Sequence, residues 1–171
     1  MFHSANDALR FAYRTINTPI IRISGINSMR PSKSSSRAAG EFTPHDRLAQ
    51  AAIIIGIVER RCDLAGIAFL NAKYGNELSG GRTERDTANT LTAAAMTALP
   101  TGNHNRRGCE KLVRTYFRQK IGMTAIRKDL DCSIRKYYEY KGKIYEIMGK
   151  IGTRTEESVY QALLAADIIV L

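Results

Sequence analysis

The chain has few of the residues that build metal sites, disulfide frameworks and catalytic centres. Its 171 residues include three cysteines and three histidines. The cysteines are Cys62, Cys109 and Cys132. No two of them have the short spacing that structural zinc sites and redox motifs use. We interpret all three as reduced thiols in the core of a cytosolic protein, and we expect neither a metal ion nor another cofactor.

Catalytic motifs are equally scarce. The histidines are His3, His45 and His104. They show neither the i,i+4 spacing of a helical metal site nor a neighbouring nucleophile motif. The Gly-Gly-Arg sequence at residues 80–82 lacks the strand and the Gly-Lys-Ser/Thr sequence of a phosphate-binding loop. The sequence therefore predicts that the protein is not an enzyme.

One enzyme alternative is a metal-dependent nuclease, in which three acids gather around a divalent ion on a basic protein. The acids are Glu59, Asp63 and Asp86. Carboxylates are commonly scattered over helix surfaces in this way, so we favour the interpretation that the three acids are ordinary solvent-exposed residues.

No segment is apolar for long enough to cross a bilayer. The longest apolar cluster spans residues 51–58, whereas a membrane-spanning helix needs about 20 apolar residues. Polar and charged residues interrupt residues 1–14, so a secretory signal is not expected. These absences predict a soluble intracellular protein without a membrane partner.

What the chain does have is positive charge, concentrated in one region. Lys and Arg number 26 against 16 Asp and Glu, which gives a net charge of +10. Residues 106–154 alone hold 14 Lys and Arg and only 5 Asp and Glu. This excess predicts a partner of opposite sign, such as nucleic acid, anionic lipid or an acidic protein.

Apolar residues recur at helical spacing along most of the chain, which predicts an all-α helical bundle. The expected helices before the basic region cover residues 5–17, 43–58, 64–74 and 83–99, and Ser4 and Thr43 are the expected N-caps of the first two. Residues 48–58 are apolar nearly all round, so we expect them to form the central core helix. The Ser-rich basic residues 31–40 predict a flexible linker or loop.

The basic region has the pattern of a helix-turn-helix. Residues 106–120 carry apolar side chains at spacings of three and four, which indicates one amphipathic helix. A short helix over residues 125–130, capped by Thr124, and a longer helix over residues 134–148, capped by Ser133, are expected to follow. In such an arrangement the last helix enters the major groove of DNA, while the preceding helix crosses the phosphate backbone.

The outward face of the last helix supplies the candidate recognition residues. They are Ser133, Arg135, Lys136, Glu139, Tyr140 and Lys143. Arg and Lys can donate to guanine edges or phosphates, Glu can accept from cytosine N4, and Tyr can reach a phosphate. The residues expected to face inward are Ile134, Tyr137 or Tyr138, Ile144, Tyr145 and Met148.

Three cations that precede the last helix are further candidates for DNA binding. They are Arg118, Arg127 and Lys128, and we place Arg118 and Lys128 on the phosphate backbone. The alternatives are a solvated basic face, and binding of RNA or of an acidic protein.

These patterns divide the chain into five parts. The parts are an N-terminal helix and connector (residues 1–30), a linker (31–42), a helical core (43–105), the helix-turn-helix region (106–152) and a C-terminal helix (153–171). Thr153 and Glu156 are predicted to open the last helix as a capping box. The apolar residues 168–171 are expected to pack on the N-terminal helices, because their exposure would be costly.

The basic helices resemble the helix-turn-helix of the fourth region of bacterial sigma factors and of related phage regulators. The stretch is GMTAIRKDLDCSIRKYYEYKGKIYEIM, at residues 122–148. Ile126 and Leu130 stand at the paired aliphatic positions of that pattern, Cys132 at the aliphatic turn position and Ser133 at the capping position. Asp131 replaces the usual turn glycine. The resemblance implies binding of double-stranded DNA in transcription control.

In its compact, basic and helical build, the whole chain is similar to the smaller Q-type late antiterminators of lambdoid phages. That resemblance implies a DNA site near a late promoter, capture of a paused RNA polymerase, and read-through of terminators in the cytoplasm of a bacterial host. A phage packaging adaptor of the small-terminase type is the structural alternative, which a ring-shaped oligomer would reveal. The sequence also leaves a homodimer open.

Overall fold

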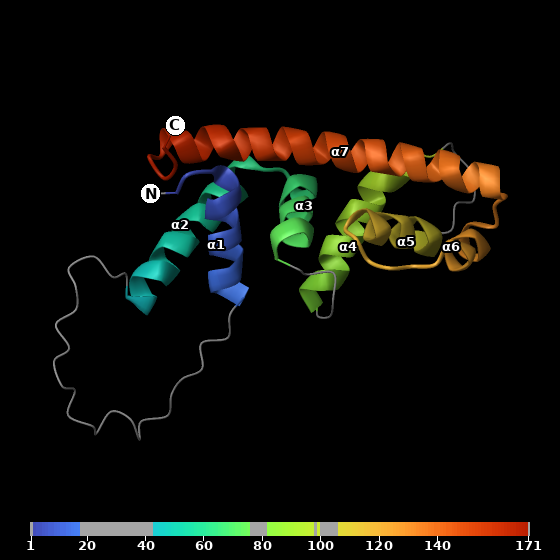
Figure 1. Ribbon diagram of the computed structural model, residues 1–171, viewed down its shortest axis with the longest axis horizontal. Coiled ribbons are helices and arrows are strands. Elements are labelled where there is room, and N and C mark those ends of the chain that lie inside the picture. The colour runs from blue at the N-terminus through green and yellow to red at the C-terminus, as the bar shows by residue number, and fades with distance from the viewer. Residues whose placement is uncertain (1, 18–42, 76–81, 98, 100–105, 171) are drawn as a thin grey trace, which may run out of the picture.

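A computed structural model describes residues 2–17, 43–75, 82–97, 99 and 106–170. Within these ranges the chain is all-helical, as the sequence predicts, and the helices pack as a bundle (Figure 1). The helices are α1 (Ala5–Asn17), α2 (Pro44–Arg61), α3 (Leu64–Tyr74), α4 (Arg82–Met96), α5 (Arg106–Tyr116), α6 (Met123–Leu130) and α7 (Ile134–Ala165). The predicted linker over residues 31–42 lies outside the described residues. None of the helices in the described ranges is long and apolar enough to cross a membrane.

The longest helix, α7, is the axis of the fold. It has 32 residues, or a length of about 48 Å at 1.5 Å per residue, and each of the other described helices contacts it. In Figure 1, α1 and α2 lie toward its C-terminal end, and α5 and α6 lie under its N-terminal end. Its buried residues recur at spacings of three and four. They are Tyr137, Tyr140, Ile144, Met148, Gly152, Thr155, Val159 and Leu163.

The prediction of two separate helices over residues 134–148 and 153–171 is wrong, because α7 runs through both without a break. Thr153 is an exposed residue in the helix interior rather than an N-cap. Gly152 stays helical because it packs directly against Phe69, where an added Cβ would lie 2.5 Å from the ring carbon Cζ. Tertiary contacts along the buried stripe outweigh the cost of about 1 kcal/mol for a glycine inside a helix. The predicted boundary after residue 152 therefore falls inside one helix.

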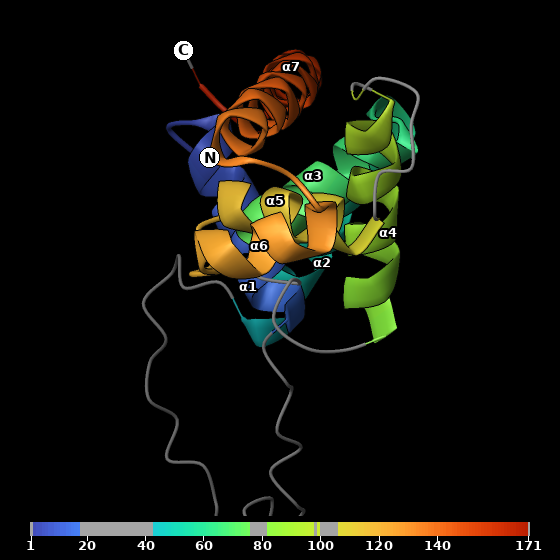
Figure 2. The ribbon, with the colours of Figure 1, turned by 90° about the vertical axis from the view of Figure 1, so that its right-hand side faces the viewer.

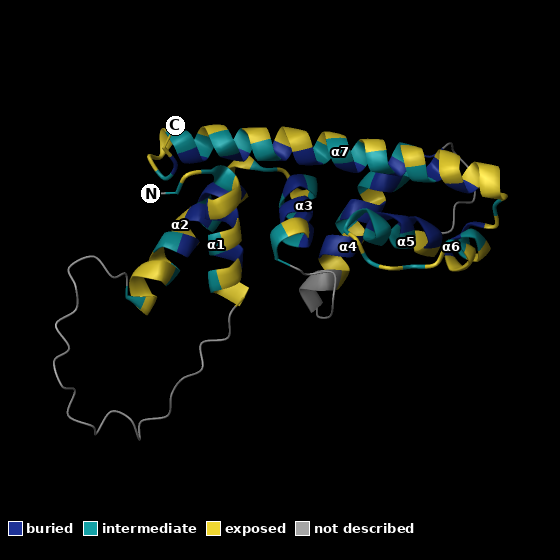
Figure 3. Ribbon diagram, viewed as in Figure 1, coloured by how far each residue is buried: buried dark blue, intermediate teal, exposed yellow. Residues whose placement is uncertain are grey.

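The prediction that α2 is the central core helix is also wrong. This helix packs on α1 and α7 at one end of the bundle, and its outer face is open in Figure 3. Ile53 has a relative exposure of 57 %, whereas Ile54 is fully buried. A helix that is apolar on all faces is not necessarily covered by other helices on all faces. The central helix of the bundle is α7.

Local capping signals set the helix starts that the sequence predicts. Thr43 and Asp46 form a reciprocal capping box, in which the Asp46 N–H donates to Thr43 Oγ1 at 3.1 Å and the Thr43 N–H donates to Asp46 Oδ2 at 2.9 Å. Ser4 Oγ accepts from the Asp7 N–H at 3.1 Å. Such bonds satisfy backbone N–H groups that have no partner within the helix.

The two ends of the chain lie together. The Phe2 N–H donates to the Ile168 carbonyl at 3.0 Å, and the Val170 N–H donates to the Phe2 carbonyl at 3.2 Å. Ile169 is buried, with 3 % exposure. The expectation that the apolar end packs against the N-terminal part is confirmed for this residue, whereas Val170 is 49 % exposed.

Candidate nucleic-acid interface

The turn between α6 and α7 contains a left-handed residue. α6 ends at Asp131, whose backbone is left-handed with φ 44° and ψ 54°. This region suits Gly best, and Asn and Asp are the other residues that enter it at modest cost. Asp131 is the position at which the sigma-type pattern carries glycine. The Arg127 side chain closes the turn, because its Nε donates to the Cys132 carbonyl at 3.2 Å.

The start of α7 is fixed by Ser133, as the sequence predicts. Its Oγ accepts from the Lys136 N–H at 3.3 Å, and its backbone is extended. By contrast, the predicted cap Thr124 is wrong, because α6 begins earlier, after Gly122, which has no side chain to cap it. The Gly122 carbonyl accepts from the N–H groups of Ala125 and Ile126.

Replacing Ser133 with alanine should lower the free energy of unfolding by about 0.5–2 kcal/mol, whereas Ser133→Gly should cost only a few tenths. Alanine leaves the α7 amide without a partner, while glycine lets water reach it. Urea unfolding of the two variants beside the parent chain tests this. Equal losses in both variants would show that the hydroxyl does not cap the helix.

α6 is held against α5 by a close packing contact and an ion pair. A Cβ on Gly108 would lie 2.5 Å from Leu130 Cγ, so only glycine lets these helices approach so closely. Lys111 Nζ lies 2.6 Å from Asp129 Oδ2, and Arg107 Nε lies 3.7 Å from it. Hydrogen bonding and attraction to Lys111 lower the pKa of Asp129 below its ordinary value of 3.8. The backbone of α6 is thus fixed on the bundle.

The stability that Asp129 supplies should disappear in acid. Because its pKa is lower in the folded chain, the carboxylate stabilises the fold above pH 3.8, and this contribution is lost as the pH falls through the lowered value. Asp129→Asn should therefore be less stable than the parent at pH 7, and its stability should fall less between pH 5 and the acid limit. Urea unfolding of both chains across this range provides the measurement. If the free energies of unfolding of the two chains changed with pH in parallel, the ion pair of Asp129 would not stabilise the fold.

The start of α7 lies at one end of the bundle, and its residues are exposed except for Tyr137, which is buried against the other helices (Figure 3). Its exposed residues are Ser133, Ile134, Arg135, Lys136, Tyr138 and Glu139. Figure 2 looks onto this end of the molecule, where α6 lies beside the start of α7. Two apolar side chains stand open there, Ile134 at 51 % and Tyr138 at 58 % exposure. The helical spacing predicted that Ile134 faces inward, and it left the next inward position open between Tyr137 and Tyr138.

Two assignments on this helix are corrected by burial. Tyr140, predicted to face outward, is buried with 9 % exposure, and Ile134, predicted to face inward, is exposed. Tyr137 and Tyr140 are three residues apart and share the stripe that leads to Ile144, so the buried face includes Tyr140. Ile134 precedes the part of α7 that the other helices cover. Tyr140 is therefore not available to reach a phosphate.

The remaining acid and base on the outward face are paired with each other. Lys143 Nζ lies 2.7 Å from Glu139 Oε1, one helical turn away. Hydrogen bonding and attraction to Lys143 lower the pKa of Glu139. The Glu139 carboxylate therefore stays ionised. It can accept a hydrogen bond from a base edge only if its ion pair with Lys143 opens or if both groups bind the carboxylate together.

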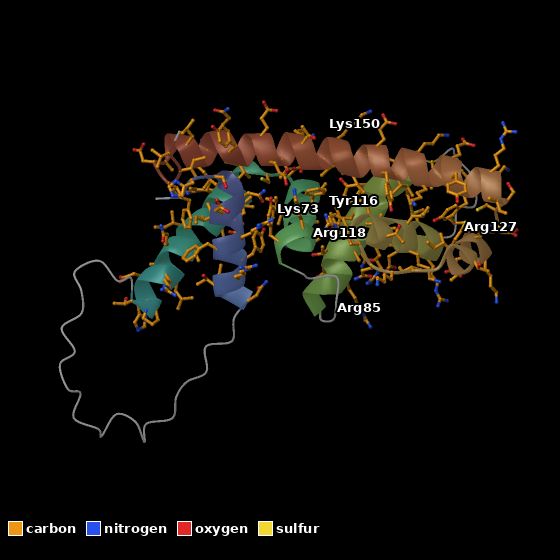
Figure 4. The ribbon with its side chains drawn as sticks, in the orientation of Figure 1. Lys73, Arg85, Tyr116, Arg118, Arg127 and Lys150 are labelled. Atoms are coloured by element: carbon orange, nitrogen blue, oxygen red, sulfur yellow. The ribbon has the colours of Figure 1, made fainter. Side chains whose placement is uncertain are left out.

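The predicted cations do not all gather at this end. Arg135 and Lys136 stand exposed on α7, and Lys128 is exposed on α6. Residues 120–143 hold seven Lys and Arg against three Asp and Glu, two of which are ion-paired. Arg118 is separate: Figure 4 places it between α3 and α5, near Lys73 and far from Arg127.

Among the described residues, no group of three His, Cys, Asp or Glu side chains is arranged to hold a metal ion. Asp63, one of the acids of the nuclease alternative, caps α3 by accepting from the Gly66 N–H at 2.8 Å, and it also pairs with Arg154.

No model of a known protein family matches the chain, and no curated protein is similar to it.

Proposed function

We propose that the protein is a sequence-specific DNA-binding transcription regulator, in which the first turn of α7 reads base edges in the major groove. The observation that supports this most strongly is that four consecutive residues, 133–136, are exposed next to a left-handed turn and a basic helix. The major groove is about 12 Å wide and admits a helix. A helix tip at the end of the bundle can enter the groove, with α6 beside it at the phosphate backbone.

Arg135 and Lys136 are the residues proposed to read bases. Both are exposed and lie in the first turn, the part of a recognition helix that contacts base edges. Arg and Lys donate to guanine O6 and N7, which makes them the commonest readers of sequence. The exposed Ile134 and Tyr138 side chains flank them and suit apolar contact with thymine methyl groups or sugars.

α6 is proposed to cross the phosphate backbone. Its exposed Lys128 can neutralise a phosphate, and the Asp129–Lys111 pair fixes the orientation of the helix while leaving Lys128 free for DNA. Arg127 is half-buried and holds the turn, so its contribution is mainly to position α7.

The experiment that tests this proposal is a selection of tight-binding duplexes from a random DNA pool at two salt concentrations. A sequence-specific regulator should enrich one motif, and a palindromic motif would indicate a homodimer. Salt-sensitive binding without enrichment would contradict base readout and leave only phosphate binding.

A sharper form of the proposal is antitermination at phage late genes, with RNA polymerase as the second partner. Its support is the resemblance to Q-type antiterminators together with the small basic helical build. Transcription in vitro through a terminator, from a promoter beside the selected site, tests this form. Added protein should increase read-through, and unchanged termination would reduce the proposal to DNA binding alone.

A further inference from the structure

A cleft of about 640 Å³ lies between α1, α3 and the end of α5, apart from the first turn of α7. Small-molecule sites commonly have volumes of about 300–1,000 Å³. The lining residues carry two kinds of chemistry, cationic and aromatic. The cations are Arg10, Arg14, Lys73 and Arg118, and the aromatic residues are Phe69, Tyr74, Tyr116 and Phe117.

The aromatic residues form a fixed wall. The ring centroids of Phe69 and Phe117 are 5.3 Å apart, and those of Tyr116 and Phe117 are 5.1 Å apart. Tyr116 also packs edge-on against Tyr145 of α7, with centroids 5.2 Å apart. Phe69 is 3 % exposed, while the other rings of the wall are half-buried and open to the cleft. A flat π-system can therefore lie against rings that are already ordered.

The cations come from α1, from α3 and from the turn that follows α5, and they line the same cleft as the aromatic rings. Lys73 is paired with Glu156, and its Nζ lies 5.3 Å from the centroid of the Tyr74 ring. The side chains of Arg10 and Arg118 form no ion pair or hydrogen bond with any residue that the structure describes. Neither Asp nor Glu is among the described residues that line the cleft. Two arginines are thus available to an anion that enters it.

The backbone of Arg118 adds an independent observation. Its φ is 66°, at the end of α5, where a helix commonly ends on a left-handed glycine. An arginine at such a position costs stability that glycine would not. Strained residues of this kind concentrate at binding and catalytic sites. The left-handed backbone of Arg118 thus supports a binding role for this residue.

We propose that this cleft binds a nucleotide, with the base against the aromatic wall and the phosphates on Arg10 and Arg118. Rings alone suit any apolar group and arginines alone suit any anion, but a nucleotide joins both within one molecule. The nucleotide is either free or an unpaired residue of a single strand. The inference does not depend on DNA reading by α7, because the two sites share no residue.

The test is binding of a fluorescent N-methylanthraniloyl ATP to the full chain. Arg118→Gly should weaken this binding at least about tenfold, because it removes a charge-assisted hydrogen bond. The same change should raise the melting temperature by about 2–4 °C, since glycine relieves the left-handed backbone. Loss of binding in a more stable chain cannot be attributed to misfolding. Undiminished binding in this variant would overturn the proposal.

Asp131→Gly is the matched control, since it also places glycine at a left-handed residue but lies in the α6–α7 turn. Asp131→Gly should bind the probe with the affinity of the parent chain. If it lost as much affinity as Arg118→Gly, the probe would not bind in the cleft.

Competition separates the base from the phosphates. Unlabelled ATP should displace the probe at concentrations about tenfold lower than inorganic tripolyphosphate, because a stacked base adds affinity. Equal potency would mean a simple anion site and would overturn the proposal. Displacement by an oligodeoxythymidylate would identify the ligand as an unpaired strand, and displacement by mononucleotides alone would identify it as a free nucleotide.

Discussion

Gly152→Ala should lower the free energy of unfolding by about 1–3 kcal/mol, the range for overpacking a well-filled core. The new Cβ would meet Phe69 at 2.5–3.1 Å from three ring carbons. The ring cannot swing aside easily, because it is 3 % exposed and packs on Phe117 and Tyr116. The gain in helix propensity from removing a glycine, about 1 kcal/mol, is too small to compensate for the clash at this position.

Gly149→Ala is the matched control for this prediction. Gly149 lies one turn earlier in α7, and nothing stands within 4 Å of its added Cβ. The same substitution should stabilise the chain here by about 0.5–1 kcal/mol. Urea unfolding followed by circular dichroism at 222 nm measures both effects. If the two variants shift in the same direction, α7 does not pack on Phe69 as one continuous helix.

Arg135→Ala and Lys136→Ala should each weaken binding to the selected DNA site by about 1–3 kcal/mol, which is about 5- to 150-fold. The loss on random duplexes should be smaller, because a base contact contributes only where the right base is present. Both residues are exposed, so the folded chain should keep its stability. Fluorescence anisotropy with the two duplexes gives both affinities.

Arg85→Ala on α4 is the control for general charge. Arg85 is exposed and lies away from the α6–α7 end (Figure 4). Its loss should change binding to neither duplex by more than a small factor. If Arg135→Ala and Lys136→Ala weakened binding equally on every DNA sequence, the two residues would contact phosphates rather than bases. If Arg85→Ala weakened binding as much, the start of α7 would not be the specific DNA contact.

The features that were predicted correctly from the sequence depend on residues that are close together in the chain. Thr43 and Ser133 were recognisable as caps because a hydroxyl three residues before an unpaired N–H forms its bond within a single turn. The inward positions of Ile126 and Leu130 follow from spacing on one short helix. The fold class follows from the same periodicity repeated along the chain.

Where the sequence failed, the deciding contact lay far away in the chain. The predicted break between residues 148 and 153 contains two glycines, and only the approach of Phe69 from α3 explains why Gly152 is needed inside a continuous helix. The choice between Tyr137 and Tyr138 for the core, and the burial of Tyr140, depended on which face of α7 the other helices cover, and the spacing of the tyrosines does not reveal this.

The composition of the candidate sites was predictable only in part. The cations of α6 and α7 were found because they cluster in the sequence. The cleft combines Arg10 of α1, Lys73 of α3 and Arg118 after α5, so no spacing connects them before the chain folds. The one sequence-level sign was an arginine where a helix end favours glycine, and it became visible only with the backbone angle.

The central claim is that the exposed start of α7 meets DNA. An amide NMR titration of the isotope-labelled chain with the selected duplex tests it most directly, because it reports each residue separately. If the start of α7 meets DNA, we expect the largest chemical-shift changes over residues 133–139, smaller ones around Lys128, and none in α1 or α2. Largest changes in α1, α2 or the cleft, with residues 133–139 unmoved, would contradict it.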